Sequence, residues 1–149
     1  MKRVFVDTNV LIDLLSRRHP HYESAAQLFS LADKKQIELA VSALTIANTS
    51  YILQKQIGTN ETKKILRTLQ LIINILPLTD KIIALASNDD KFIDFEDGLQ
   101  FFTAVQFKQD VIVTRNLKDF KKSTIPVLSA EQFLQTLNLK VWRQENTAT

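Results

Sequence analysis

The sequence contains no cysteine, only two glycines and only three prolines among its 149 residues. The absence of cysteine excludes disulfide bridges and thiolate metal sites, and it suits a protein of the reducing cytosol. The scarcity of glycine and proline leaves little material for long linkers. We therefore expect helices and strands to follow one another closely within one domain.

Long hydrophobic runs are also missing. A membrane-spanning helix needs about 18 or more apolar residues in a row with little or no charge, and no such stretch is present. The longest apolar run, residues 69–78, is interrupted by Gln70 and Asn74. The apolar segment near Val4 is short and ends at Asp7, so we expect no signal peptide. These features predict a cytoplasmic protein that does not associate with membranes.

The remaining composition is that of an ordinary globular domain. Hydrophobic residues make up 45% of the chain, and its length suffices for one buried core. The 19 Lys and Arg against 16 Asp and Glu give a net charge of +3, which by itself does not indicate nucleic-acid binding. Four of these cations crowd one short segment, and they are Arg115, Lys118, Lys121 and Lys122. From charge alone we interpret that segment as solvated surface.

Short apolar runs alternate with segments of helical periodicity. The predicted strands are residues 3–6, 37–41, 75–78, 111–113 and, more weakly, 126–128. Helices are predicted between them and over residues 129–137, with Asn9, Thr59 or Asn60, Thr79 and Asp94 as N-caps. This alternation predicts a three-layer α/β/α sandwich around a mainly parallel sheet. We expect one domain over residues 1–137 and a polar tail over residues 138–149.

Polar residues directly follow two of the predicted strands. They are Asp7, Thr8 and Asn9 after the first strand, and Thr114, Arg115, Asn116 and Asp119 after the strand at residues 111–113. In a parallel sheet, ligands bind beyond the carboxyl ends of the strands. A carboxylate buried there must be compensated by a metal ion, a cation or several hydrogen-bond donors. Asp7 is therefore a candidate functional residue, with N-capping as the structural alternative.

Two further segments contribute polar candidates. Asp97 shares a helical stripe with Phe101 and Ala104, so it should face inward, whereas Asp94 is explained as an N-cap. Asn48 lies on a predicted stripe of Leu44, Ala47 and Tyr51, and it is either a satisfied core asparagine or part of an active site. Asn116 and Asp119 have the alternative of capping a short turn. His19 and His21, which flank Pro20 in a predicted loop, are interpreted as surface residues.

Acidic or amide groups from four distant segments thus fall at the same edge of the predicted sheet. Three or more hard oxygen ligands suit Mg²⁺ or Mn²⁺. No combination of Cys and His suggests zinc, because the chain has no cysteine and only two histidines. We therefore interpret this edge as a candidate site for Mg²⁺ or Mn²⁺.

Four segments of the sequence resemble the PIN-domain family, and especially the small bacterial toxins of type II toxin–antitoxin pairs. They are VFVDTN at residues 4–9, VSALTIAN at 41–48, DFEDGLQ at 94–100 and VTRNLKDF at 113–120. They stand in the family's order, and the resemblance covers about residues 1–137. The opening segment alone is moderately specific, whereas all four in order are strongly so.

The resemblance implies a ribonuclease that uses Mg²⁺ or Mn²⁺. The implied catalytic residues are Asp7, Asp97 and Asp119 (or, as the second choice for the last, Asn116), with Asp7 and Asp97 as metal ligands. The supporting residues are Thr8, Asn9, Asn48, Asp94, Thr114 and Asn116. Arg115, Lys118, Lys121 and Lys122 lie beside this edge and would attract the RNA backbone. The implied partners are RNA, a cognate antitoxin and a second copy of the chain.

One position departs from the family's pattern. Asn48 stands where the family usually has glutamate, and a neutral amide is a weaker ligand that cannot act as a base. The change either weakens metal binding, shifts the load to Asp94 or Glu96, or marks a degenerate domain that binds RNA or protein without cutting. Two other classes fit less well. A dehalogenase-like phosphatase needs a second aspartate where Asn9 stands, and a receiver domain needs paired acids near the first strand.

Overall fold

The computed structural model describes residues 1–147, with side chains described up to residue 138. Its strands are β1 (Arg3–Val6), β2 (Glu38–Ser42), β3 (Asn74–Leu76), β4 (Val111–Val113) and β5 (Val127–Leu128). Its helices are α1 (Thr8–Leu15), α2 (Tyr22–Asp33), α3 (Ala43–Ile57), α4 (Thr59–Leu69), α5 (Asp80–Asn88), α6 (Phe95–Gln106) and α7 (Ala130–Thr147), with the 3₁₀ helix η1 (Leu117–Phe120). None of these helices is long and apolar enough to cross a membrane.

The strands form one parallel sheet in the order β3-β2-β1-β4-β5. The chain first builds outward from β1 to β3 and then returns to the other side of β1 for β4 and β5. The order therefore reverses between β1 and β4, and a ligand site is expected at such a reversal. Val6 is in register with Val113, so the carboxyl ends of β1 and β4 lie side by side.

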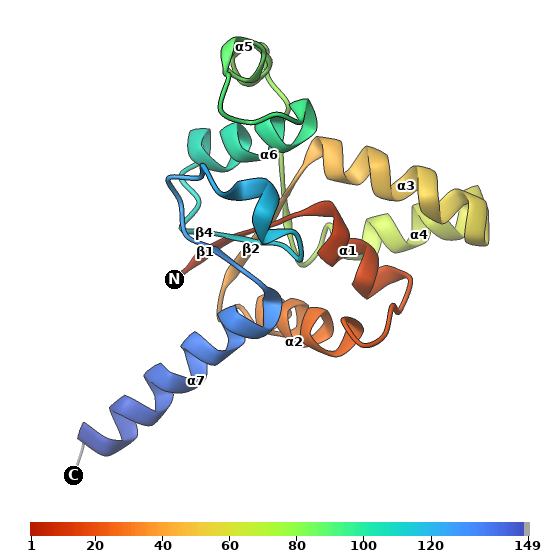
Figure 1. Cartoon of the computed structure of the whole chain (residues 1–149). Coiled ribbons are helices and arrows are strands. Elements are labelled where there is room, and N and C mark those ends of the chain that lie inside the picture. The colour runs from red at the N-terminus through yellow and green to blue at the C-terminus, as the bar shows by residue number, and fades with distance from the viewer. Residues whose placement is uncertain (148–149) are drawn as a thin grey trace.

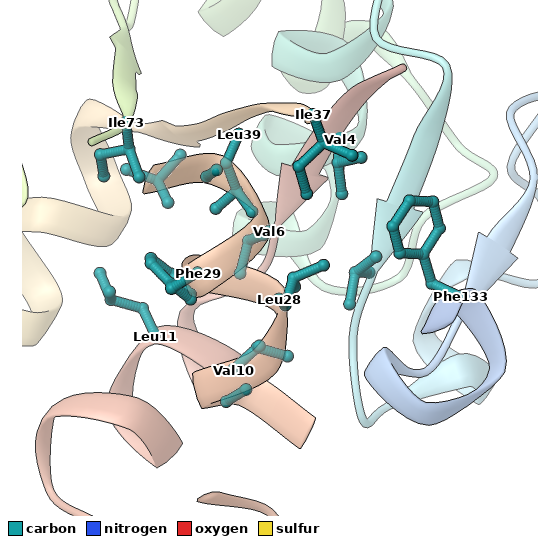
Figure 2. Close-up of a cluster of buried hydrophobic side chains, with 14 of the residues drawn as sticks. Val4, Val6, Val10, Leu11, Leu28, Phe29, Ile37, Leu39, Ile73 and Phe133 are labelled. Carbon is teal, nitrogen blue, oxygen red and sulfur yellow. The ribbon is translucent and has the colours of Figure 1, made fainter. Parts of the chain in front are cut away.

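The two faces of the sheet bury different sets of side chains, because successive residues of a strand point to opposite faces. Val4 and Val6 pack against α1, α2 and α7, with Leu28 and Phe133 in the same cluster (Figure 2). Phe5 points to the opposite face, where α6 packs with Phe101 and Ala104 and η1 packs with Phe120. Figure 1 shows α2 and α6 on opposite sides of the sheet. The predicted three-layer α/β/α fold is thus confirmed.

The predicted start of α4 and the predicted end of α7 are wrong. Gly58, at φ +82°, ends α3 and directly precedes α4, so neither Thr59 nor Asn60 is the N-cap. Glycine adopts this left-handed backbone without steric cost, which allows the two helices to follow one another through a single residue. The last helix, predicted to end at Leu137, continues as α7 to Thr147 and runs out from the body of the domain in Figure 1. The sequence beyond Leu137 includes lysine, arginine, glutamine and glutamate, whose high helix propensity favours this continuation. Residues 148–149 of the predicted tail lie outside the described residues.

Candidate functional site

Asp7 stands where β1 ends and α1 begins. Its backbone N–H donates to the carbonyl oxygen of Val113 at 2.9 Å, so the pairing of β1 with β4 continues up to this residue. Its Oδ1 accepts from the backbone N–H of Thr8 at 2.8 Å and caps α1. The prediction that Asn9 caps this helix is wrong, because the helix already begins at Thr8. Asp7 is therefore the N-cap of α1, which was the structural alternative to a functional role. Capping uses only part of its carboxylate.

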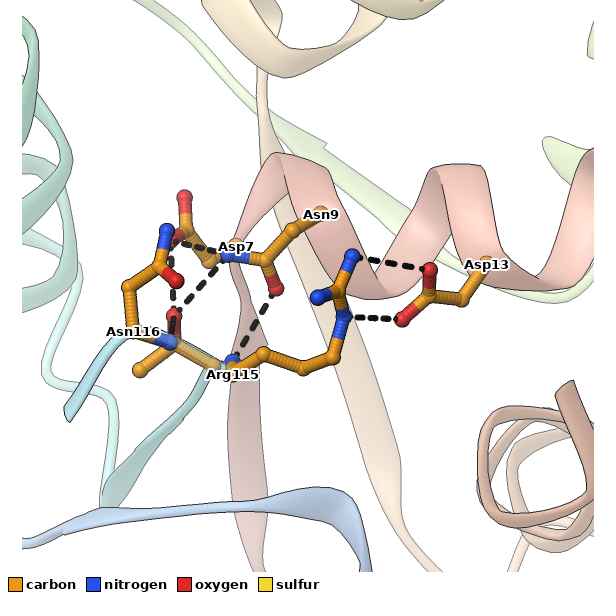
Figure 3. Close-up of polar contacts among 6 residues, drawn as sticks. Asp7, Asn9, Asp13, Arg115 and Asn116 are labelled. Atoms are coloured by element: carbon orange, nitrogen blue, oxygen red, sulfur yellow. Dashed lines mark hydrogen bonds and ion pairs between the residues drawn. The ribbon is translucent and has the colours of Figure 1, made fainter. Parts of the chain in front are cut away.

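Both oxygens of the Asp7 carboxylate accept hydrogen bonds from other elements. Oδ1 also accepts from Nε2 of Gln100 at 3.2 Å, while Oδ2 accepts from Oγ1 of Thr114 at 2.9 Å and Nδ2 of Asn9 at 3.2 Å. Figure 3 shows Asn9 beside Asp7 in this arrangement. Asp7 is only 8% exposed, and burial raises its pKa even though its hydrogen bonds oppose the shift. The site thus contains a buried carboxylate at considerable desolvation cost.

Gln100 connects Asp7 to α3. Its side chain is 3% exposed, its Nε2 donates to Oγ1 of Thr45 at 2.7 Å, and its Oε1 accepts from the hydroxyl of Ser42. The hydroxyls of Thr8 and Thr45 lie 2.8 Å apart and share a hydrogen bond. No role was predicted for Gln100 from the sequence. The sequence feature that could have identified Gln100 is its polar side chain on the inward-facing side of the helix, between Asp97 and Phe101.

Asp97 is half-buried in the first turn of α6, as predicted. Its pKa is raised to about 7, first by burial and then by repulsion from Asp94, Asp119, Asp7 and Glu96. Asp119 also acts on Asp7 in the same direction. The structure therefore brings together the three predicted acids Asp7, Asp97 and Asp119, close enough for their charges to oppose one another.

The donor set fits a hard divalent cation. A cation among these carboxylates would lower their mutual repulsion, and Mg²⁺ is commonly held by one or two carboxylates while several waters complete its shell. Among the described residues, no group of three or more Asp, Glu, His or Cys side chains is arranged tightly enough to hold a metal by itself.

Asp94 caps α6 as predicted, since its Oδ1 accepts from the N–H of Asp97 at 3.1 Å.

The stripe of Leu44, Ala47 and Tyr51, from which Asn48 was predicted to face inward, is not the buried face of α3. The buried residues of α3 are Thr45, Thr49 and Leu53, whereas Tyr51 is 63% exposed. The prediction assigned the wrong buried face to α3 because it treated Thr45 as a polar surface residue. Thr45 is in fact buried, and its hydroxyl forms hydrogen bonds with Thr8 and Gln100. Asn48 is half-buried, one helical turn after Thr45, and so lies near the site-facing side of α3.

The segment after β4 is tied to α1 by side-chain contacts. Oγ1 of Thr114 accepts from Nδ2 of Asn9 at 3.2 Å and from the backbone N–H of Asn116 at 3.0 Å. The backbone N–H of Arg115 donates to Oδ1 of Asn9 at 3.1 Å. Thr114, Asn9 and Asn116 therefore hold the loop between β4 and η1 beside Asp7 (Figure 3).

Arg115 forms a bidentate ion pair with Asp13. Its Nε lies 2.6 Å from Oδ2 of Asp13 and its Nη2 lies 3.1 Å from Oδ1, while Asp13 is 1% exposed (Figure 3). The guanidinium is thus bound within the protein, and its predicted contact with RNA stays a prediction. Asp13 was not predicted from the sequence, where its signal was a charged residue three positions after Val10 on the apolar stripe of α1.

A cavity of about 400 Å³ opens beside the acidic residues. It is lined by Phe92, Ile93, the acids Asp94, Asp97 and Asp119, and the cations Lys91, Lys118, Lys121 and Lys122. Three of the four cations predicted to attract RNA therefore lie at the same cavity as two of the predicted catalytic acids. Lys91, from the loop before α6, was missed because it is distant in sequence from the other lysines.

The chain is similar to several proteins of known name or structure. The chain is 29% identical over 144 residues to ribonuclease VapC1 of Aquifex aeolicus (strain VF5), covering 92% of this chain and 96% of that protein. A toxin–antitoxin complex from Klebsiella pneumoniae has a chain that superposes with a TM-score of 0.65 at 25% identity, covering 85% of this chain and 97% of the other. VapBC2 of Rickettsia felis, bound to a promoter DNA fragment, has the same fold, with a TM-score of 0.62 at 19% identity over 85% of this chain and 96% of the other.

The resemblance inferred from the four sequence segments is confirmed at the level of the family. Residues 3–118 match the family model described as PIN domain, and this range includes β1, β4 and the acidic residues Asp7 and Asp97. The chain belongs to the PIN-domain family.

Proposed function

We propose that this chain is a metal-dependent endoribonuclease and the toxin of a toxin–antitoxin pair. The observation that carries the proposal is the group of Asp7, Asp97 and Asp119 at the point where the strand order reverses, beside a cavity lined with lysines. The similarity to ribonuclease VapC1 of Aquifex aeolicus supports it. Acidic residues that bind a cation, flanked by cations that bind phosphates, suit the cleavage of a phosphodiester.

The mechanism assigns a task to each part of the site. Asp7 and Asp97 would hold Mg²⁺ or Mn²⁺, and Asp119, from η1, supplies the third acidic group. The bound ion would orient water and neutralise the charge that develops on the phosphate. Thr114 and Asn9 hold the Asp7 carboxylate in a fixed orientation, which avoids reorganisation during the reaction.

The lysines of the cavity should contribute to RNA binding through their charge. Replacing Lys118, Lys121 and Lys122 with alanine should weaken binding and reduce the slope of log K against log salt by roughly 2, since each cation on single-stranded RNA releases about 0.7 counterions. The measurement is a salt titration of RNA binding by fluorescence anisotropy. A matched control replaces the three exposed lysines Lys34, Lys35 and Lys63. A slope that does not change in the first variant would leave these lysines as solvated surface.

Asn48 distinguishes an enzyme from a degenerate binding module. Asn48→Glu adds a hard oxygen ligand near Asp7 and Asp97, and it adds repulsion when no metal is present. We expect the variant to bind Mn²⁺ more tightly than the parent and to melt at a lower temperature in chelator. Calorimetric titration and thermal melting measure both effects, and RNA cleavage is assayed in parallel with Mn²⁺ and with chelator.

The outcomes of the Asn48→Glu experiment separate the two functions. Cleavage by the parent in Mn²⁺, and none in chelator, supports the proposed ribonuclease. If parent and variant both bind Mn²⁺ but only the variant cuts RNA, the natural protein is a binding module. Unchanged metal affinity in the variant would place Asn48 outside the site.

We extend the proposal to two protein partners. A cognate antitoxin is supported by the similarity to a chain of the Klebsiella pneumoniae toxin–antitoxin complex, and a homodimer is implied by the family. Co-expression with the protein encoded by the neighbouring gene, followed by assay of the complex, tests the antitoxin. A neighbouring gene product that neither binds this chain nor suppresses cleavage would contradict it. Light scattering of the purified chain tests the dimer.

A further inference from the structure

Protein donors occupy the whole hydrogen-bonding capacity of Asp7. A carboxylate offers about four lone-pair positions. On Asp7, Oδ1 accepts from Thr8 N–H and from Gln100, and Oδ2 accepts from Asn9 and Thr114. A cation that binds this carboxylate directly must therefore take the place of one of these donors.

The geometry indicates which donor would leave. Gln100 reaches Oδ1 of Asp7 from α6, so Oδ1 is the oxygen on the α6 side. Asp97 is on the same helix, one turn before Gln100, and a cation shared by Asp7 and Asp97 would approach from that side. The other donor to Oδ1 is the backbone N–H of Thr8, which belongs to the cap of α1 and cannot leave without disturbing the first turn. Gln100 is the donor on this oxygen that can be displaced.

Gln100 also has alternative acceptors for its amide hydrogens. Its Nε2 already donates to Oγ1 of Thr45 at 2.7 Å, and Oγ1 of Thr8 lies 3.4 Å away. The bond from Ser42 to its Oε1 keeps the side chain in place. Release from Asp7 would therefore not leave a buried donor without an acceptor, which would cost free energy in a side chain that is 3% exposed.

We propose that Gln100 is a positioning residue that holds the Asp7 carboxylate while no cation is bound and releases it when a cation bridges Asp7 and Asp97. The inference rests on the proposed metal-dependent function. The amide and the cation then compete for the same oxygen. Removing the amide should therefore destabilise the metal-free protein more than the metal-bound protein, and by thermodynamic linkage it should tighten metal binding.

Gln100→Leu tests this competition, because leucine removes the amide and adds no ligand. We expect its dissociation constant for Mn²⁺, measured by calorimetry, to be roughly tenfold lower than the parent's, since a hydrogen bond to a charged group is lost from the metal-free state alone. Its melting temperature should fall more in chelator than in saturating Mn²⁺. The matched control is Gln109→Leu, which removes a buried glutamine that donates to Phe107 beyond the other end of α6. This control should leave the Mn²⁺ affinity unchanged.

A second variant keeps the proposal falsifiable where Gln100→Leu does not fold. Gln100→Glu preserves the shape but replaces the donor with a carboxylate that repels Asp7, so addition of Mn²⁺ should raise its melting temperature more than it raises the parent's. An equal rise would overturn the proposal, and so would unchanged or weaker Mn²⁺ binding by folded Gln100→Leu. If the parent protein binds no Mn²⁺, both the proposed function and the role of Gln100 are overturned. If the parent binds Mn²⁺ and the Gln100 variants do not behave as expected, only the role of Gln100 is overturned.

Discussion

Asp7→Asn should lower Mn²⁺-dependent RNA cleavage by at least about a thousandfold, equivalent to roughly 4 kcal/mol of lost transition-state stabilisation. The variant replaces a charged oxygen with an amide nitrogen, which cannot bind a cation. Asp7 is also the most buried of the three proposed site acids, and it lies beside Thr114 of the neighbouring strand end. Its loss should therefore lower both metal affinity and the rate of cleavage.

The Asp7→Asn variant should still fold. Asparagine keeps an oxygen that can cap α1 through the N–H of Thr8 and accept from Gln100, whereas its amide nitrogen loses the hydrogen bonds that Oδ2 accepts from Asn9 and Thr114. Burial raises the pKa of Asp7, so its charged form is disfavoured in the folded protein, and removing that charge offsets part of the lost hydrogen bonding. We expect a change in the free energy of unfolding of no more than about 1–2 kcal/mol.

The matched control for Asp7→Asn is Asp110→Asn. Asp110 also accepts a hydrogen bond from a backbone N–H, that of Arg3 at 2.8 Å, but it precedes β4 at the opposite edge of the sheet. Cleavage rates and thermal melting of both variants are compared with the parent. If folded Asp7→Asn cuts RNA as fast as Asp110→Asn, the proposed metal site is in the wrong place.

The strand segments and the candidate acids that follow them were predictable because both are local properties of the chain. A buried strand such as β1 is a short apolar run, and the first polar residue after it marks its carboxyl end. The parallel direction of the strands then puts Asp7 at the same edge of the sheet as the end of β4, whereas the pairing of β1 with β4 is known only from the structure. Asp97 was predictable for a similar reason, since helical periodicity alone turns it inward with Phe101.

The pairing of polar side chains between elements could not be predicted in the same way. Gln100 and Ser42 are distant in sequence, and only the packing of α6 against the start of α3 makes one the partner of the other. Hydrophobic periodicity also treats every threonine as polar, so it assigned the wrong face to α3, where Thr45 is buried and satisfied. Arg115 was grouped with the nearby lysines by sequence, whereas its partner Asp13 is on α1.

Asp13→Ala should be strongly destabilising, with a loss of about 3 kcal/mol in the free energy of unfolding, because it leaves the Arg115 charge without its buried partner. We place the effect at the lower end for a broken buried pair, since the side chain of Arg115 is 32% exposed and retains contact with water. In a domain of this size the loss corresponds to a decrease in melting temperature of roughly 10 °C. Thermal or denaturant unfolding measures it. Cleavage should also fall, because Arg115 holds the loop in which Thr114 contacts Asp7.

Two comparisons show whether the effect of Asp13→Ala comes from the buried charge. Glu38→Ala breaks the exposed pair of Glu38 with Arg3, at 3.7 Å, and should cost less than about 1 kcal/mol. The double variant Asp13→Leu with Arg115→Met removes both charges. It should recover much of the stability lost in Asp13→Ala, because no charge is then left without its partner. Equal melting temperatures for Asp13→Ala and Glu38→Ala would contradict this account. The ion pair would then behave as a surface contact, and the position of the loop after β4 would depend on Asn9 and Thr114 alone.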